Sequence, residues 1–413
     1  MSSNRVVVTG LGIISPSGLN PDDLWESLMT GRSGVGPITK FDTSDHAVRI
    51  AAEVRDFDPA AYLDRKEVRR MDPCCQFAVA AAREAFEHSG LDRDTLNLDR
   101  MGVVLGTGQG GITSLVEQME VFYKKGPRRV SPFLIPMMIT NMPAGHVGID
   151  LGARGPNMTL TTACAASAHA IGESFRLLQR GDADVVATGG AEAGIVSVSL
   201  AGFTSMKALS ANNDDPAGAC RPFDAERDGF VLGEGGVVMI LETLDHAEAR
   251  GAEILAELLG YGASNDAHHI TAPPPSDEGG ARSMAEAIRD ANLDPGDIDY
   301  INAHGTGTPT GDTAESRAVE TVFGDRAWEV PVSSTKSLTG HLLGAAGALE
   351  SAICILAMKE GVIPPTANLT RPGEGCNLDY VAEGPRPARL DVTLTNSFGF
   401  GGQNASLVWG RPK

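Results

Sequence analysis

One cysteine in this 413-residue chain stands where a side chain can react. Cys164 lies in the stretch LTTACAASA, between a β-rich run that ends at Ala163 and a helical run that ends before Gly181. The free N–H groups at a helix start stabilise a thiolate, so this position predicts a lowered thiol pKa and a nucleophilic sulfur. The small side chains after it leave room for a substrate. An inert buried cysteine is the alternative until partners are identified.

Two histidines are the candidate partners. His304 follows the strand-like run DYINA and His341 follows the run VPVSST, and both lie in Gly-rich turns, where side chains commonly bind ligands. Lys336 lies between an apolar strand and a small-residue helix in which Glu350 can supply a counter-charge. The helix after His304 is predicted to begin with a capping box that Asp312 and Glu315 form, three residues apart.

The run SFGFGGQN, residues 397–404, is the third candidate element. Its three glycines let the backbone approach a ligand closely, and a free N–H group there can stabilise a developing negative charge. The rings of Phe398 and Phe400 can serve as a wall or a gate.

Short β-rich runs alternate with Ala-rich helical runs along the chain, which predicts an α/β fold with sheets covered on both faces. Strands are expected at RVVVTG, MGVVLGTG, MTLTTA, ADVVATGG, GVVMILE, EILAELLGYG, DYINAHG, VPVSST and LDVTLTNSFGFGG. Helices are expected over PDDLWESLMT and over the run that stops before Gly90. A polar helical stretch around 244–254 connects two sets of strands, so we predict two halves, 1–250 and 251–413, packed as one body.

Composition argues against several classes of function. The chain has 34 basic and 53 acidic residues, a net charge of −19, which disfavours nucleic-acid binding. Its six cysteines show no C-x-x-C pair and no zinc-site spacing with histidines, so neither a disulfide scaffold nor a structural metal is expected. The run GTGQGG lacks the acid that a dinucleotide site needs about 20 residues later. No stretch has the length of a signal peptide or a membrane span, so a cytoplasmic location is expected.

Taken together, these segments resemble the β-ketoacyl-[acyl-carrier-protein] synthases, most closely the type II elongating enzymes of the thiolase-like fold. The resemblance runs the whole chain, through RVVVTGLGIISPSG, RPFDAERDGFVLGEG, HGTGTPTGD, SSTKSLTGHLLGAAGALES and NSFGFGG. It implies a five-layer α/β/α/β/α architecture of two duplicated halves, and a homodimer.

The resemblance also implies a mechanism. Cys164 would accept an acyl chain from a carrier-protein thioester, and the carbanion released when malonyl-carrier protein loses carbon dioxide would attack it. His304 and His341 would donate hydrogen bonds to the malonyl thioester carbonyl. The N–H groups of Cys164 and Phe400 would form the oxyanion hole, and Lys336, supported by its acid, would set the electrostatics of the site.

Further residues take their expected roles from the same resemblance. Thr306 and Thr308 would hold the 4'-phosphopantetheine arm, which arrives on the carrier protein, so no resident cofactor is expected. Gates are expected at Phe203, at Phe400 and at Thr271 in the loop SNDAHHITAPPP. By analogy a monovalent cation is expected near Asn302, Glu350 and Asn396. The acidic carrier protein would dock on basic residues: Lys66, Arg69, Arg70, Arg128, Arg129 and Lys207.

Two positions depart from the family pattern. Gln109 stands where the deep end of the acyl pocket usually carries an aliphatic residue, and Leu134 stands where a second Phe often crosses the dimer. An unpaired buried amide costs roughly 1–3 kcal/mol, so Gln109 either has a protein partner or faces a less ordinary chain. Two-carbon elongation in fatty acid biosynthesis is the predicted function. A discrete polyketide or polyene ketosynthase, with or without a chain-length-factor partner, is the alternative.

Other proteins of the same fold fit less well. A non-catalytic partner subunit typically lacks the nucleophile, whereas the cysteine, both histidines and the lysine are present here. A thiolase needs a second cysteine near the C-terminus, and Cys376 lies well short of the Gly-rich terminal loop. The initiating synthases use Cys-His-Asn, whereas the segment TKSLTGH favours the form with two histidines.

Overall fold

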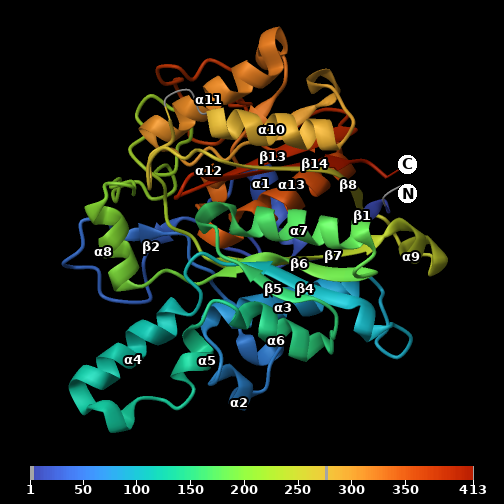
Figure 1. Cartoon of the computed structure of the whole chain (residues 1–413). Helices are drawn as coiled ribbons and strands as arrows, with labels where there is room; N and C mark the ends of the chain where they lie inside the picture. Colours follow the sequence, from blue (N-terminus) through green and yellow to red (C-terminus); the bar gives the residue numbers. More distant parts are fainter. Residues whose placement is uncertain (1–3, 275–277, 413) are drawn as a thin grey trace.

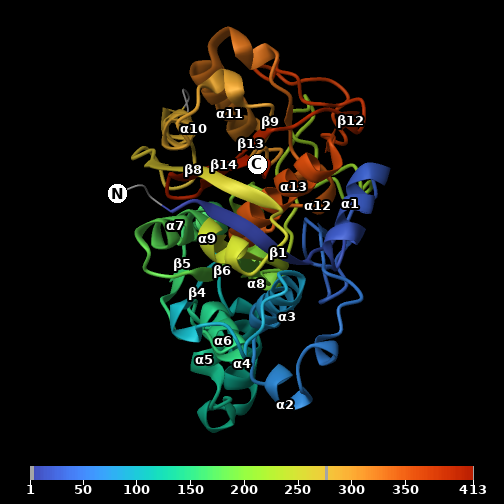
Figure 2. The ribbon, with the colours of Figure 1, turned by 90° about the vertical axis from the view of Figure 1, so that its right-hand side faces the viewer.

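A computed structural model describes residues 4–274 and 278–412 (Figure 1). Two sets of strands form one continuous sheet in the order β10-β9-β13-β14-β8-β1-β7-β6-β4-β5. The join between the sets is short, because β1 (Val6–Ile14) pairs with β8 (Ala256–Asn265) only over Val6–Val8. Figure 2 shows these two strands side by side.

The remaining strands divide between the two sets. The first set holds β7 (Gly235–Thr243), β6 (Val185–Glu192), β4 (Met101–Gly106) and β5 (Asn157–Leu160), which lies at the edge. The second set holds β14 (Gln403–Gly410), β13 (Val392–Gly399), β9 (Tyr300–Asn302) and β10 (Val332–Ser333). Two small separate sheets pair β2 (Gly36–Pro37) with β3 (Ile50–Ala51) and β11 (Val362–Ile363) with β12 (Arg386–Pro387).

Helices cover both faces of each set, which produces five layers (Figures 1 and 2). On the outer face of the first set lie α3 (Pro73–His88) and α6 (Met142–Leu151). Between the sets lie α7 (Ala166–Arg180) and α13 (Ala346–Glu360), and on the outer face of the second set lie α10 (Glu278–Asp290) and α11 (Pro309–Phe323). The expected α/β/α/β/α architecture is confirmed.

The other helices lie around this frame. They are α1 (Pro21–Thr30), α2 (Arg65–Val68), α4 (Ile112–Lys125), α5 (Leu134–Met138), α8 (Ser197–Ser205), α9 (Leu244–Ala249) and α12 (Lys336–Thr339). The predicted α1 is confirmed, with Asn20 accepting from the N–H of Asp23 and Gly31 in the left-handed conformation at its end. Among the helices of the described residues, none combines the length and the apolar character that crossing a membrane requires.

The central layer depends on small side chains. Helix α13 is buried on every side from Ala346 to Met358, and its small and apolar side chains make up all of this stretch except Glu350 and Ser351. A Cβ on Gly347 would lie 2.9 Å from the Cβ of Ala168, so glycine permits the close packing of α13 against α7. The N–H of Ala348 donates to the Ser167 hydroxyl oxygen at 2.9 Å, which ties the two helices together across the halves.

Two details differ from the sequence expectation. The strand β14 was not among the predicted runs, because QNASLVWG begins with polar residues after a Gly-rich turn, yet it pairs with β13 on one side and β8 on the other. The polar connection expected near 244–254 is helical only as α9, over Leu244–Ala249, and β8 begins at Ala256.

Candidate active site

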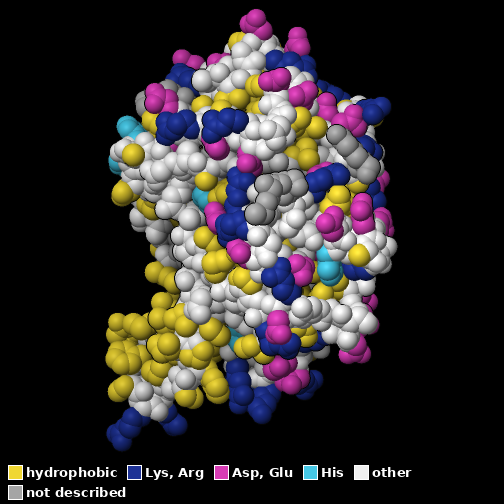
Figure 3. Space-filling view, turned by 45° about the vertical axis from the view of Figure 1, so that its right-hand side comes forward, with side chains coloured by type: hydrophobic (Ala, Val, Ile, Leu, Met, Phe, Trp, Pro, Cys, Tyr) yellow, Lys and Arg dark blue, Asp and Glu magenta, His cyan; other side chains and the backbone are white. Residues whose placement is uncertain are grey.

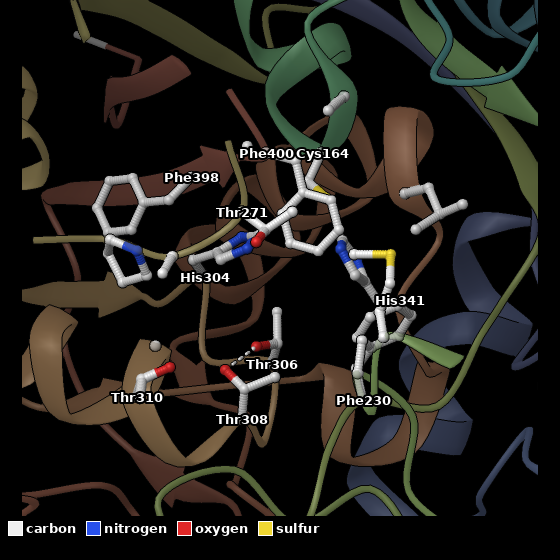
Figure 4. A pocket seen from close by; sticks show the side chains of 18 of the residues that line it. Cys164, Phe230, Thr271, His304, Thr306, Thr308, Thr310, His341, Phe398 and Phe400 are labelled. Carbon is white, nitrogen blue, oxygen red and sulfur yellow. Dashed lines mark hydrogen bonds between the residues drawn. The ribbon is translucent and has the colours of Figure 1, made fainter. Parts of the chain in front are cut away.

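Cys164, His304 and His341 line one cavity of about 350 Å³ (Figure 4). Their sulfur and ring nitrogen atoms lie within 4.8 Å of one another. Cys164 follows β5, His304 follows β9, and His341 follows α12, so the two halves of the chain meet at this point. The structure therefore brings together the three residues that the sequence singled out.

Cys164 lies in a short 3-10 turn, Ala163–Ala165, that leads into α7. Ala163 has φ 49°, an unfavourable conformation for a residue with a side chain, and Cys164 is only 8% exposed. Burial raises the pKa of the Cys164 thiol to about 12, although Lys336 and the N–H of Phe400 act to lower it. The expected lowering is therefore wrong, because the loss of hydration outweighs the favourable charges.

The two histidine rings meet edge to face, with centroids 5.4 Å apart. Burial and the charge of Lys336 hold the pKa of both imidazoles well below its usual value, so both are neutral. Within the described residues, neither ring nitrogen of His341 has a hydrogen-bond partner, and the same holds for Nδ1 of His304. Each ring can therefore offer one N–H donor and one lone pair to a ligand.

Two buried acids hold the loop that carries His304. Glu315 accepts from the N–H groups of His304 at 2.8 Å and Gly305 at 2.7 Å, and Asp312 accepts from the N–H of Gly307 at 3.1 Å. The predicted capping box is wrong, because α11 begins at Pro309, three residues before Asp312, and both acids lie inside it. Sequence reasoning missed this role, although a spacing of three places both carboxylates on one helix face.

Lys336 and Glu350 form an ion pair with side chains only 1% and 3% exposed. Burial raises the pKa of Glu350 to about 7, against the opposing effect of the Lys336 charge. The cation affects the pKa values of Cys164 and both histidines in the direction that disfavours positive charge and favours a thiolate. The predicted electrostatic role thus has a structural basis, since the charge lies close to all three groups.

The rest of the cavity has a polar and an apolar side. Thr306 and Thr308 hydroxyls are hydrogen-bonded to each other at 3.1 Å on the His304 side, with Thr271 and Thr310 nearby (Figure 4). Phe230 lies beside His341, with ring centroids 5.2 Å apart. Phe400, the expected oxyanion donor, also lines the cavity. The lining includes these predicted substrate-binding residues: Thr306, Thr308, Phe203, Gln109, Thr271 and Phe398.

Leu134 and the loop that contains Thr271 were both expected to lie at the substrate-binding cavity. Leu134 is the first residue of α5 and is not among the residues that line the cavity of the single chain. Its expected contribution would come across a dimer, so that assignment stays a prediction. The loop that contains Thr271 reaches the cavity through His269, Thr271, Ala272 and Pro273. Its last residue, Pro275, lies outside the described residues.

The basic residues expected to bind a partner are exposed. Lys66, Arg69 and Arg70 belong to α2 or follow it, and Arg128 and Arg129 follow α4. The Arg70 guanidinium lies 4.5 Å from the centroid of the Phe133 ring, which brings the first group against the segment that leads into α5. Lys207 is exposed at the cavity rim and lines it.

Comparison with known proteins places the chain in a family. The model of the Beta-ketoacyl synthase N-terminal domain matches residues 3–247, and that of the C-terminal domain matches residues 255–370. A protein named 3-oxoacyl-[acyl-carrier-protein] synthase 2, from Synechocystis sp., is 51% identical over 409 residues, which cover 99% of this chain and 98% of that protein.

Two solved structures are similar over 100% of both chains. The ishigamide ketosynthase/chain length factor has a TM-score of 0.93 at 37% identity. A type II PKS acyl-carrier protein in complex with its ketosynthase, bound to the hexaketide, has a TM-score of 0.91 at 30% identity.

Proposed function

Because the chain belongs to the β-ketoacyl synthase family, we propose that its cavity joins an acyl chain on Cys164 to a malonyl group. The protein is an acyltransferase of the 3-oxoacyl-[acyl-carrier-protein] synthase type, which lengthens acyl chains by two carbons in fatty acid biosynthesis. The observation that carries the mechanism is the meeting of one thiol and two neutral imidazoles in one cavity.

The first step is acyl transfer. The Cys164 thiol loses its proton as the sulfur attacks the thioester carbonyl of an acyl-carrier protein, and the carrier thiol leaves with a proton. The carbonyl oxygen becomes negative in the intermediate, and the N–H groups of Cys164 and Phe400 stabilise it. The N–H of Phe400 already points to the Cys164 sulfur, which supports this assignment. Because the thiol pKa is high, proton removal belongs to this step, and a neutral imidazole has the lone pair to receive the proton.

The second step forms the carbon–carbon bond. The bond between the malonyl carboxylate and its α-carbon breaks, carbon dioxide leaves, and the electron pair forms an enolate. N–H donors of His304 and His341 stabilise the enolate oxygen, a task that neutral rings perform without protonating the carbon. The α-carbon then attacks the acyl thioester on Cys164, and the 3-oxoacyl product leaves on the carrier while the sulfur regains a proton.

The carrier protein supplies the only prosthetic group in this proposal. Its 4'-phosphopantetheine arm enters from the threonine side, where Thr306 and Thr308 present hydroxyl groups. No resident cofactor takes part. The exposed basic residues around α2 and after α4, together with Lys207, provide the docking surface for this acidic partner on a chain whose net charge is −19.

A second copy of the chain completes the proposed assembly. Strand β5 is the outermost strand of its set, and Met158 on it is 41% exposed. Hydrophobic side chains gather over the projection that α4 and α5 form, with Lys and Arg at its tip (Figure 3). The exposed apolar residues of this surface include Met119, Phe122, Phe133, Ile135 and Ile139. A free strand edge beside an apolar patch of this kind favours pairing with another chain, and we propose a homodimer.

Unpaired buried oxygen atoms support the proposal of a monovalent cation. Within the described residues, Asn302 Oδ1, Glu350 Oε2 and Thr395 Oγ1 are buried without hydrogen-bond partners, and Thr395 is opposite Asn302 in the β9–β13 register. Carboxylate, amide and hydroxyl oxygens are suitable ligands for such an ion, which would neutralise the buried carboxylate. Asn396 is less available, because its side chain is bonded to Glu315 and Ser406.

The polyketide alternative has weaker support. The ketosynthases of that kind are 37% and 30% identical to this chain, whereas the synthase from Synechocystis is 51% identical. A cytoplasmic location also belongs to the proposal, and the six unpaired cysteines support a reducing compartment.

Intact mass spectrometry tests the proposal. The purified protein is incubated with saturated acyl-carrier proteins and then with malonyl-carrier protein, with Cys164→Ala as control. We expect an acyl adduct on Cys164 that turns over to a 3-oxoacyl product. An adduct only with polyketide chains, or only with an added partner subunit, would favour the alternative, and labelling of the Ala variant would refute the nucleophile.

A further inference from the structure

Gln109 is a polar residue on the apolar side of the cavity, and its side chain has a hydrogen-bond partner there. Beyond Cys164, the cavity is lined by Phe230 and Leu343, which belong to an apolar cluster that also contains Ile195 and Leu200. Gln109 is half-buried and lines this same cavity. An amide is an unexpected lining for a space that an acyl chain would fill, so its surroundings indicate its role.

Three neighbours surround Gln109, and one of them bonds its side-chain amide. Ser199 on α8 donates its hydroxyl proton to Oε1 at 3.1 Å. The backbone N–H of Gln109 donates to the buried carboxylate of Glu192 at 3.0 Å. A Cβ on Gly194 would lie 2.6 Å from Oε1, so a side chain there would displace the amide. The amide oxygen of Gln109 therefore has a protein partner, the Ser199 hydroxyl.

The amide nitrogen is not paired. Within the described residues, Nε2 of Gln109 has no hydrogen-bond partner, so both of its protons are available to water or a ligand. A saturated chain pressed against Nε2 would remove that water and offer no acceptor. The unpaired donor would then weaken binding roughly five- to hundredfold.

We propose that Gln109, fixed by Ser199, is a specificity-determining residue that disfavours saturated acyl chains long enough to reach its amide. This inference rests on the proposed function, because it assigns the apolar side of the cavity to the acyl chain. Chains that end before Gln109 leave the amide hydrated, and a chain with an oxygen acceptor at that depth satisfies it.

The test separates polarity from size. Wild type, Gln109→Met and Gln109→Ala are acylated with a graded series of saturated acyl-carrier proteins, and the rate of Cys164 adduct formation is measured. Met keeps the length of Gln without its polar atoms, so we expect Gln109→Met to raise the rate for long chains about fivefold or more relative to short ones. If only Gln109→Ala raises the rate of adduct formation with long chains, the size of the side chain rather than its polarity limits chain length, and the inference is wrong.

An oxygen scan gives a second, independent readout. In long chains one methylene at a time is replaced by an ether oxygen, which accepts but does not donate. We expect one or two positions to restore acylation of the wild type and to have no effect in Gln109→Met. No position-dependent rescue would overturn the inference. Normal adducts with an unchanged length profile refute this inference alone, whereas absence of any Cys164 adduct refutes the proposed function.

Discussion

Lys336 and Glu350 form a nearly completely buried ion pair whose cation faces the reactive thiol and both histidines. Removing one partner would leave the other charge in a medium of low polarity. We therefore expect Lys336→Met to lower the free energy of unfolding by roughly 3–5 kcal/mol. The double variant Lys336→Met with Glu350→Leu should recover most of that loss in denaturant titrations, while acyl transfer stays impaired. A double variant no more stable than the single one would contradict this account.

The Cys164 thiol should behave as a protonated thiol at rest, because burial raises its pKa to about 12. The rate of alkylation by iodoacetamide should rise about tenfold per pH unit between about pH 7 and pH 10 without levelling off, since the thiolate is the nucleophile. A plateau below pH 8 would show that the thiol ionises more easily than the structure indicates. Cys164→Ala provides the background rate from the other cysteines.

Glu192 should make stability depend on pH. Its carboxylate accepts from the N–H groups of Gly108 and Gly344 as well as Gln109, yet burial raises its pKa from 4.5 to about 7. Between these values the folded chain holds a proton that the unfolded chain has lost, so this residue lowers stability as pH rises. The stability of Glu192→Gln relative to wild type should therefore increase by roughly 1–3 kcal/mol from pH 5 to pH 8.

An exposed glutamate provides the control for the pH dependence expected of Glu192→Gln. Glu329 has a side chain 69% exposed, and Glu329→Gln should show no such trend across the same pH range. Thermal unfolding at several pH values measures both variants. A flat difference for Glu192→Gln would mean that its three N–H donors keep the carboxylate ionised in the folded protein.

Glu315 should affect the second step of the reaction more than the first. It holds the backbone of His304 and Gly305, so Glu315→Ala leaves two N–H groups unpaired and frees the loop that carries His304, one of the two proposed enolate donors. We expect acylation of Cys164 to change less than threefold or so, and decarboxylation of malonyl-carrier protein to fall by a factor on the order of a hundred. Equal losses in both steps would indicate a general collapse of the site.

Charge reversal at the proposed docking surface should weaken only reactions of the carrier protein. Arg69→Glu with Arg70→Glu removes two exposed cations, one of which also packs on Phe133. We expect KM for acyl-carrier protein to rise roughly tenfold at low salt, with a smaller effect at high salt, and reaction with small thioesters to be unchanged. Arg389→Glu, at a side chain 84% exposed outside this surface, is the control. Equal loss on both substrates would refute the docking assignment.

The elements of the site could be predicted from the amino-acid sequence, because the cysteine and both histidines each follow a strand-like run and carry a local signal. Cys164 at a strand-to-helix turn, the histidines in Gly-rich turns and the terminal run with Phe400 could all be found in this way. The alternating runs also predicted the fold class, since hydrophobic periodicity is a local property. The strand β14 was not predicted, because its first residues are polar. Its position between β13 and β8 is seen only in the folded chain.

Properties that depend on burial could not be predicted from local sequence, because burial depends on how distant segments pack. Helix position alone predicts a lowered pKa for Cys164, but the depth of the surrounding protein reverses the direction. The sequence spacing of Asp312 and Glu315 predicted a helix cap. In the folded chain they accept from the N–H groups of Gly307 and His304 instead, because α11 packs against the loop that carries His304. Likewise, Ser199 as the partner of Gln109 comes from a helix 90 residues away along the chain, a distance that no local pattern spans.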